Sequence, residues 1–172
     1  MALRDRVLGI DFGSKRIGLA MSDPLFIAAH PLQAIHVVAG NLQAAVREIA
    51  SLAREHGVKL AVVGLPLNMD DSEGPQSKVT RDFAALLEAE SGLTVLLEDE
   101  RLTSMAAEEI LRETATSPKR RKKARRSGKV DVVAAQVLLQ AWMDRTQREE
   151  AALARENEVP DEGEPDEEDE DE

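Results

Sequence analysis

Hydrophobic residues in the first part of the chain occur as short continuous runs and then at helical spacing. The runs at 6–13 and 16–22 predict two strands of a hairpin, joined by a tight turn at 13–15. A third strand is expected within 25–38. The apolar positions of 41–56 recur every three or four residues and stop before a glycine, which predicts an amphipathic helix.

Buried strands and helices alternate in the rest of the chain. An apolar run at 59–64 is typical of a central parallel strand, and a polar loop at 65–74 leads to Pro75, which suits the first turn of a helix. The later elements are expected to be a strand at 94–97, a helix at 104–113, a basic linker at 114–128 and a helix at 131–147.

This order of elements predicts the α/β class. Three strands in a meander, followed by helical crossovers to two further strands, give a mixed five-stranded sheet with helices on both faces. In such sheets, active sites lie at the carboxyl ends of neighbouring central strands.

Composition limits the chemistry that this chain can perform. The chain has 172 residues and no cysteine, which excludes disulfides, thiol catalysis and zinc–thiolate sites. Aromatic residues make up only 2% of the chain, so extended base stacking on aromatic side chains is not expected. No signal peptide or membrane span is visible in the sequence, and we expect a cytoplasmic protein.

Charge divides the chain into two parts. The net charge is -11, but residues 149–172 hold fourteen acids and one arginine, which leaves a mildly basic body. We therefore expect one domain at 1–147, with a basic loop at 114–130, and a disordered acidic tail at 148–172. A mildly basic domain is compatible with a nucleic-acid partner.

Acidic residues stand at the ends of three expected elements. Asp11 ends the first buried strand, the acids 98–100 end the last one, and Asp131 begins the final helix. A structural interpretation exists for each: a turn aspartate, a solvated loop and a helix N-cap. Together, however, they can converge on one site, where carboxylate oxygens suit a hard cation such as Mg²⁺ or Mn²⁺. Carboxylate-held cations support hydrolysis of phosphodiester bonds.

Basic residues accompany these acids. The run at 119–129 holds eight positive residues and no acid, and it directly precedes Asp131. It is either a solvated linker or a phosphate-binding segment with little sequence preference. The candidate substrate-binding residues are Lys15, Arg16, Arg101, Arg120, Arg121, Lys122 and Lys123.

At four stretches, 9–23, 63–70, 99–104 and 131–140, the sequence closely resembles the YqgF/RuvX family of RNase H-like resolvases and ribosomal RNA-processing nucleases. The motifs occur in the family's order and cover roughly residues 7–143. The resemblance implies an RNase H-like fold. It also implies a divalent-metal-dependent nuclease that acts on the 5′ end of pre-16S ribosomal RNA, on branched DNA such as Holliday junctions, or on both.

The resemblance also implies which residues carry the chemistry. It aligns Asp11 with the family's first acid, the pair Asp99 and Glu100 with the second, and Asp131 with the third; we favour Glu100 within the pair. These three acids would be both catalytic and metal-binding. Two positions depart from the family's pattern: Asp71 replaces an expected glycine, and Ser104 stands where threonine is usual.

Two other classes of protein share some of these features. The segment 9–15 resembles the phosphate loop of actin-like and sugar-kinase-like ATPases, but those proteins need two such domains and a second loop. A non-catalytic nucleic-acid-binding module is the other alternative. ATP turnover would identify the first class, and absence of metal-dependent cleavage would identify the second.

Overall fold

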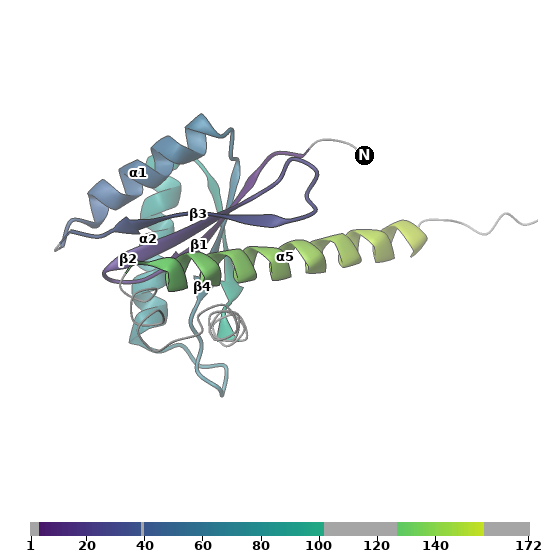
Figure 1. The fold of residues 1–172 in the computed structure, drawn as a ribbon. Coiled ribbons are helices and arrows are strands. Elements are labelled where there is room, and N and C mark those ends of the chain that lie inside the picture. Colours follow the sequence, from purple (N-terminus) through teal and green to yellow (C-terminus); the bar gives the residue numbers. More distant parts are fainter. Residues whose placement is uncertain (1–3, 39, 102–126, 157–172) are drawn as a thin grey trace, which may run out of the picture.

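A computed structural model describes residues 4–38, 40–101 and 127–156 (Figure 1). The elements in chain order are β1 (Val7–Phe12), β2 (Arg16–Ser22), β3 (Ala29–His36), α1 (Leu42–Glu55), β4 (Leu60–Leu65), α2 (Pro75–Ser91), β5 (Thr94–Asp99) and α5 (Lys129–Glu156). The expected helix at 104–113 and residues 119–126 of the basic run lie outside the described residues, as does the chain after Glu156.

The five strands form one mixed sheet in the order β3-β2-β1-β4-β5. Strands β1, β2 and β3 pair antiparallel, whereas β4 runs parallel to β1 and to β5. The predicted α/β fold with a meander and two crossovers is therefore confirmed. The carboxyl ends of β1, β4 and β5 meet at one edge of the sheet because the three strands are parallel.

Helices cover the two faces of the sheet unequally. Helices α1 and α2 lie on one face, and α5 crosses the other (Figure 1). On the α1/α2 face, large side chains such as Leu8, Ile10 and Phe83 form the main core. On the α5 face, Val62, Leu139 and Trp142 belong to a smaller core. Successive strand residues point to opposite faces, so this division follows the alternation along each strand.

Local signals explain where the helices begin. The side chain of Asn41 caps α1 by accepting a hydrogen bond of 3.1 Å from the amide of Ala44. Pro75 occupies the first turn of α2, as its fixed φ favours. Both starts agree with the sequence prediction.

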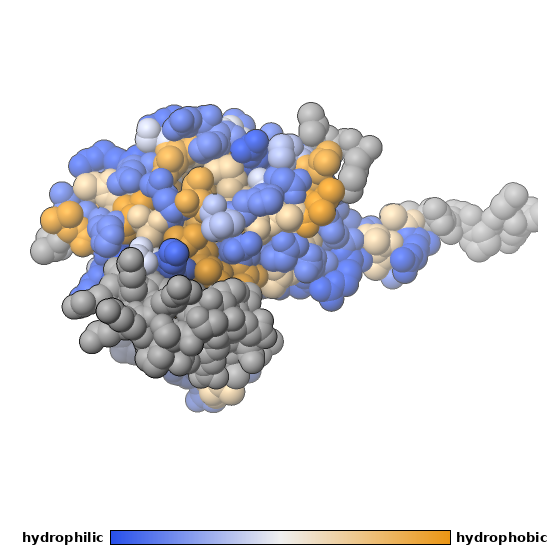
Figure 2. All heavy atoms as spheres, in the orientation of Figure 1, coloured by the Kyte–Doolittle hydropathy of each residue, from blue (hydrophilic) through white to orange (hydrophobic). Residues whose placement is uncertain are grey.

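The end of α5 differs from the prediction. The helix continues to Glu156, not Gln147, and its last part projects beyond the sheet (Figure 1). That end carries a mixture of hydrophilic and hydrophobic residues on its surface (Figure 2). Arg4 pairs with Glu150 there, with nitrogen–oxygen distances of 3.1 and 2.7 Å. The first acidic residues thus belong to a helix, and the expected domain boundary after residue 147 stays a prediction. No helix within the described ranges is long and apolar enough to cross a bilayer.

Candidate active site

Two acids lie at the edge where the parallel strands end. Asp11 is the penultimate residue of β1, and Glu100 directly follows β5. Alternation along β1 places Asp11 on the α5 face, because its neighbours Ile10 and Phe12 belong to the core under α1 and α2. The site therefore forms between this edge of the sheet and the start of α5.

Asp131 reaches the same place because glycine lets α5 approach the sheet. Asp11 pairs with Gly18 in the β1–β2 register. A Cβ atom at Gly18 would lie 2.0 Å from the backbone oxygen of Asp131, so any other residue would push the helix away. The missing side chain at Gly18 brings the first turn of α5 onto β2, beside Asp11.

A second glycine makes room for Glu100. A Cβ atom at Gly64, near the end of β4, would lie 2.6 Å from Oε2 of Glu100. The carboxylate of Glu100 therefore lies over β4, the strand between β5 and β1. This position directs it toward Asp11.

The charges of Glu100 and Asp131 affect the ionisation of Asp11. The pKa of Asp11 is raised to about 7, mainly because burial disfavours its charged form, and further because the charges of Glu100 and Asp131 repel it. Burial, followed by the charge of Asp99, also raises the pKa of Glu100. Glu100 and Asp131 thus lie near enough to Asp11 to act on its charge, and their assignment to one metal site stays a prediction.

The adjacent acids of β5 have different partners. Glu98 pairs with Arg145 of α5, with Nη2 and Oε2 2.7 Å apart. Asp99 pairs with Arg101, whose guanidinium lowers the pKa of this carboxyl below its usual value. Of the three, Glu100 is the one whose charge acts on Asp11.

The candidate cationic residues also differ in their contacts. Lys15 is exposed on the β1–β2 turn, just beyond Asp11. The side chain of Arg16 donates from Nε to Oδ2 of Asp131 at 2.9 Å. Arg101 is held by Asp99 and Asp71. The residues Arg120, Arg121, Lys122 and Lys123 lie outside the described residues.

The donor set fits a hard divalent cation. The charges of Glu100 and Asp131 act on the partly buried Asp11, and a cation bound among the three carboxylates would remove their mutual repulsion. Among the described residues, no three His, Cys, Asp or Glu side chains already have the spacing of a metal site. Arg16 forms an ion pair with Asp131 in the structure. This carboxylate would have to leave the ion pair, at least in part, to bind a cation.

Sequence reasoning missed two structural requirements of this site. It identified neither Gly18 nor Gly64 as a position of close approach, and it treated Arg16 as a phosphate contact only. The glycines stand inside apolar strands, where glycine is otherwise unfavourable, and this was the signal available.

Comparisons with known proteins identify the family. The model of the family described as "RuvX: Holliday junction resolvase" matches residues 5–145. A Myxococcus xanthus protein is 43% identical over 81% of this chain and 87% of its own length. A Listeria monocytogenes protein is 40% identical over 82% of this chain and 99% of its own. Both carry the description "Putative pre-16S rRNA nuclease".

A solved structure has the same fold. RuvC of Thermus thermophilus, in complex with a Holliday junction substrate, aligns with a TM-score of 0.52 at 15% identity, over 84% of this chain and 97% of RuvC. The expected RNase H-like fold is thereby confirmed. The family model covers most of the chain, and the four motifs of the sequence fall within its limits. The chain therefore belongs to the RuvX family.

Proposed function

We propose that this protein is a divalent-metal-dependent nuclease that hydrolyses phosphodiester bonds in structured nucleic acid. Membership of a family of nucleases and resolvases supports the reaction class. The single observation that carries the mechanism is that Asp131 lies against Gly18 and Glu100 against Gly64, on the strands either side of β1, where both carboxylates act on the charge of Asp11.

We propose that Asp11, Glu100 and Asp131 hold Mg²⁺ or Mn²⁺. A cation bound there would activate water and stabilise the leaving oxygen of a phosphodiester. Asp11 is fixed by the sheet, so it would define the position of the reacting phosphate. Arg16 would hold Asp131 until a cation takes over this carboxylate, and Gly18 lets the backbone of Asp131 approach the strand beside Asp11.

The names of the relatives support processing of pre-16S ribosomal RNA as the leading substrate class. The description of the family model supports branched DNA as the second. Both substrates are structured polyanions. We propose that Lys15, Arg16, Arg101 and the basic run, with Arg120, Arg121, Lys122 and Lys123, contact their phosphates, and that the reaction takes place in the cytoplasm.

A cleavage assay tests this function. The full-length protein is incubated with Mg²⁺ or Mn²⁺ and with four labelled substrates: a single strand, a duplex, a four-way DNA junction and a pre-16S RNA fragment. We expect metal-dependent cleavage of at least one structured substrate. The Asp11→Asn variant keeps the size of the side chain but removes its charge, and cleavage should fall by about 1000-fold or more.

The matched control is Glu98→Gln, which removes a nearby carboxylate that pairs with Arg145 and is not one of the proposed metal ligands. It should retain most of the activity. Equal cleavage by wild type and Asp11→Asn would rule out the mechanism. Tight binding without any cleavage would favour a non-catalytic module, and ATP turnover without nucleic acid would favour an ATPase.

A further inference from the structure

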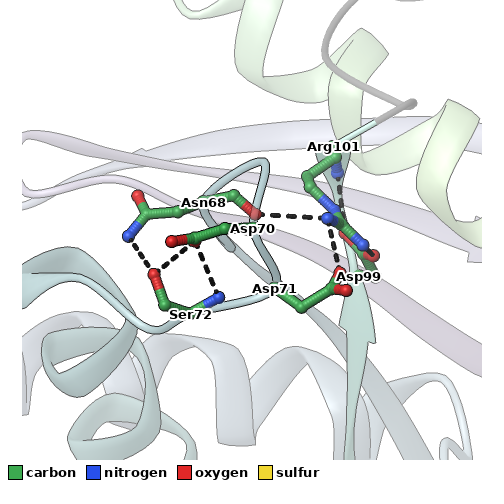
Figure 3. A network of polar contacts seen from close by, with 6 residues as sticks. All are labelled: Asn68, Asp70, Asp71, Ser72, Asp99 and Arg101. Atoms are coloured by element: carbon green, nitrogen blue, oxygen red, sulfur yellow. Dashed lines mark hydrogen bonds and ion pairs between the residues drawn. The ribbon is translucent and has the colours of Figure 1, made fainter.

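Arg101 lies beside the candidate site and forms ion pairs with two acids from different parts of the chain. It follows Glu100 directly, and its guanidinium contacts Asp99 at the end of β5 and Asp71 in the loop after β4 (Figure 3). Its Nη1 atom lies 2.7 Å from Oδ1 of Asp71 and donates to the backbone oxygen of Asn68 at 3.2 Å. The arginine thus links the loop to the edge of the sheet where Glu100 stands.

The two acids differ in how many contacts they make with Arg101. Asp99 accepts from Nε at 2.9 Å, from Nη2 at 2.6 Å and from the backbone amide of Arg101 at 3.1 Å. Asp71 touches only Nη1, and its side chain is 78% exposed against 40% for Asp99. Asp99 therefore orients the guanidinium, whereas Asp71 covers its other end from solvent.

The backbone of the loop does not call for an acid at position 71. Asp71 has a φ of 64°, in the left-handed region that glycine adopts most easily and that Asn and Asp adopt more often than other residues. The contacts that shape the loop involve other side chains: Asn68 donates to Ser72 at 2.8 Å, and the amide of Ser72 donates to Asp70 at 3.1 Å. The carboxylate of Asp71 thus contributes charge beside Arg101, at some cost in backbone strain.

We propose that Asp71 occupies the place of a substrate phosphate at Arg101. The inference rests on the proposed function, in that the displacing ligand is a nucleic-acid phosphate. Asp99 presents the guanidinium with its Nη1 edge outward, and the carboxylate of Asp71 is an anion at hydrogen-bond distance from that edge. Arginine binds carboxylates and phosphates through the same planar donors. A phosphate that takes this position must first displace Asp71.

This competition lowers affinity and keeps Arg101 oriented while substrate is absent. With both acids in place the group carries a net negative charge, which repels a polyanion at low salt. The Asp71 pair is exposed, and such pairs are weak. The need to displace Asp71 should therefore weaken the binding of nucleic acid by no more than about fivefold.

The test is a binding measurement that does not depend on cleavage. Fluorescence anisotropy of a labelled four-way DNA junction and of a labelled RNA hairpin is recorded in EDTA over a series of NaCl concentrations. Asp71→Asn removes the charge with almost no change in size, and it should tighten binding by about threefold to fivefold at low salt. The slope of log affinity against log salt should steepen by about 0.7 to 0.9, as for one additional phosphate contact.

Two further variants separate this competition from a general charge effect. Asp70→Asn removes an adjacent charge that bonds to Ser72 and not to Arg101, so it should change the salt slope much less. In an Arg101→Gln background, Asp71→Asn should tighten binding much less, because only the general effect of its charge remains. Asp71→Gly, which also removes the strain, should bind at least as tightly as Asp71→Asn, and circular dichroism verifies that each variant is folded.

Unchanged binding by Asp71→Asn would overturn the inference, as would equal tightening in the Arg101→Gln background. Either result would leave the proposed nuclease intact if metal-dependent cleavage is observed. If Asp71→Asn tightens binding through Arg101 but no cleavage appears with any metal, the competition stands and the nuclease proposal fails. Failure of the chain to bind either probe would overturn both.

Discussion

On the face of the sheet covered by α1 and α2, strand β1 places Leu8, Ile10 and Phe12. On the face covered by α5, the alternate positions of the same strand are Val7, Gly9 and Asp11. The first face has large apolar side chains, and the second has small residues and a carboxylate. Small residues let a helix backbone approach the sheet closely, and this approach brings acids from three elements together.

Stability and chemistry thus depend on opposite faces of one sheet. Large buried side chains stabilise the fold through the apolar area that they remove from water. The α5 face has a smaller core of its own, but close to Asp11 it carries Gly18, Gly64 and the buried charges of the site. Changes on the first face should therefore alter folding, and changes near Asp11 should alter catalysis.

The largest expected effect is on the α1/α2 face. Leu8 is fully buried in the main core, and Leu8→Ala would leave a cavity there. The free energy of unfolding should fall by about 2 to 5 kcal/mol. Urea denaturation measures this loss, and cleavage per folded molecule should stay near the wild-type value. A loss below about 1 kcal/mol would show that this face does not carry the stability.

The next effect is a pH-dependent stability on the α5 face. The pKa of Asp11 is about 7 in the fold, against 3.8 when unperturbed, because burial and neighbouring charges disfavour ionisation. Below pH 3.8 the group is protonated in both states. As pH rises toward 7 the unfolded chain ionises first, so stability falls across this window and stays lower above it.

Asp11→Asn stays neutral and should escape this loss. In EDTA at pH 8, the variant should be more stable than the wild type by on the order of 2 to 4 kcal/mol, and the difference should vanish near pH 3.5. Urea denaturation at both pH values measures it. The same difference at pH 3.5 and pH 8 would contradict the raised pKa.

A third effect tests the close approach of α5. Gly18→Ala places a methyl group against the backbone of Asp131, so the first turn of the helix must move away from Asp11. Misplacement of a catalytic group by about 1 Å should lower cleavage about 100-fold. The control is Gly9→Ala, which presses on the backbone oxygen of Ala135 and on Leu139, one and two turns further along the same helix. If both variants lose equal activity, the position of Asp131 is not the cause.

The smallest expected effect concerns Glu98. Its partner Arg145 is about half exposed, so Glu98→Gln should cost less than about 1 kcal/mol of stability and change cleavage less than about threefold. Glu100→Gln, two residues away, should abolish most cleavage. The two variants are assayed side by side. Higher activity in Glu100→Gln than in Glu98→Gln would refute the roles assigned to these two acids.

Much of the fold could be predicted from the sequence because its signals are local. The apolar runs of β1, β4 and β5 and the helical spacing in α1 identify these elements without tertiary information. The true end of α5 could not be found in this way. Residues 148–156 carry no apolar stripe, yet Arg, Glu, Ala and Leu favour a helix, and Arg4 pairs with Glu150 from the far end of the chain.

The acids of the site could be proposed from the sequence because a carboxylate at the end of a buried strand is unusual. Their surroundings could not. Arg16 and Asp131 are 115 residues apart in the chain, and their ion pair depends on how α5 crosses β2. The role of Gly64 likewise depends on Glu100, which directly follows a different strand. Contacts between distant elements need the fold before they can be identified.

We propose that Asp11, Glu100 and Asp131 form one metal site. This proposal is tested most directly by a crystal structure of the protein with Mn²⁺, recorded where manganese scatters anomalously. We predict an anomalous peak within about 2.0 to 2.3 Å of carboxylate oxygens of Asp11 and of at least one of the other two acids. A peak at another place with none between these residues, or three carboxylates that stay apart from any bound Mn²⁺, would contradict it.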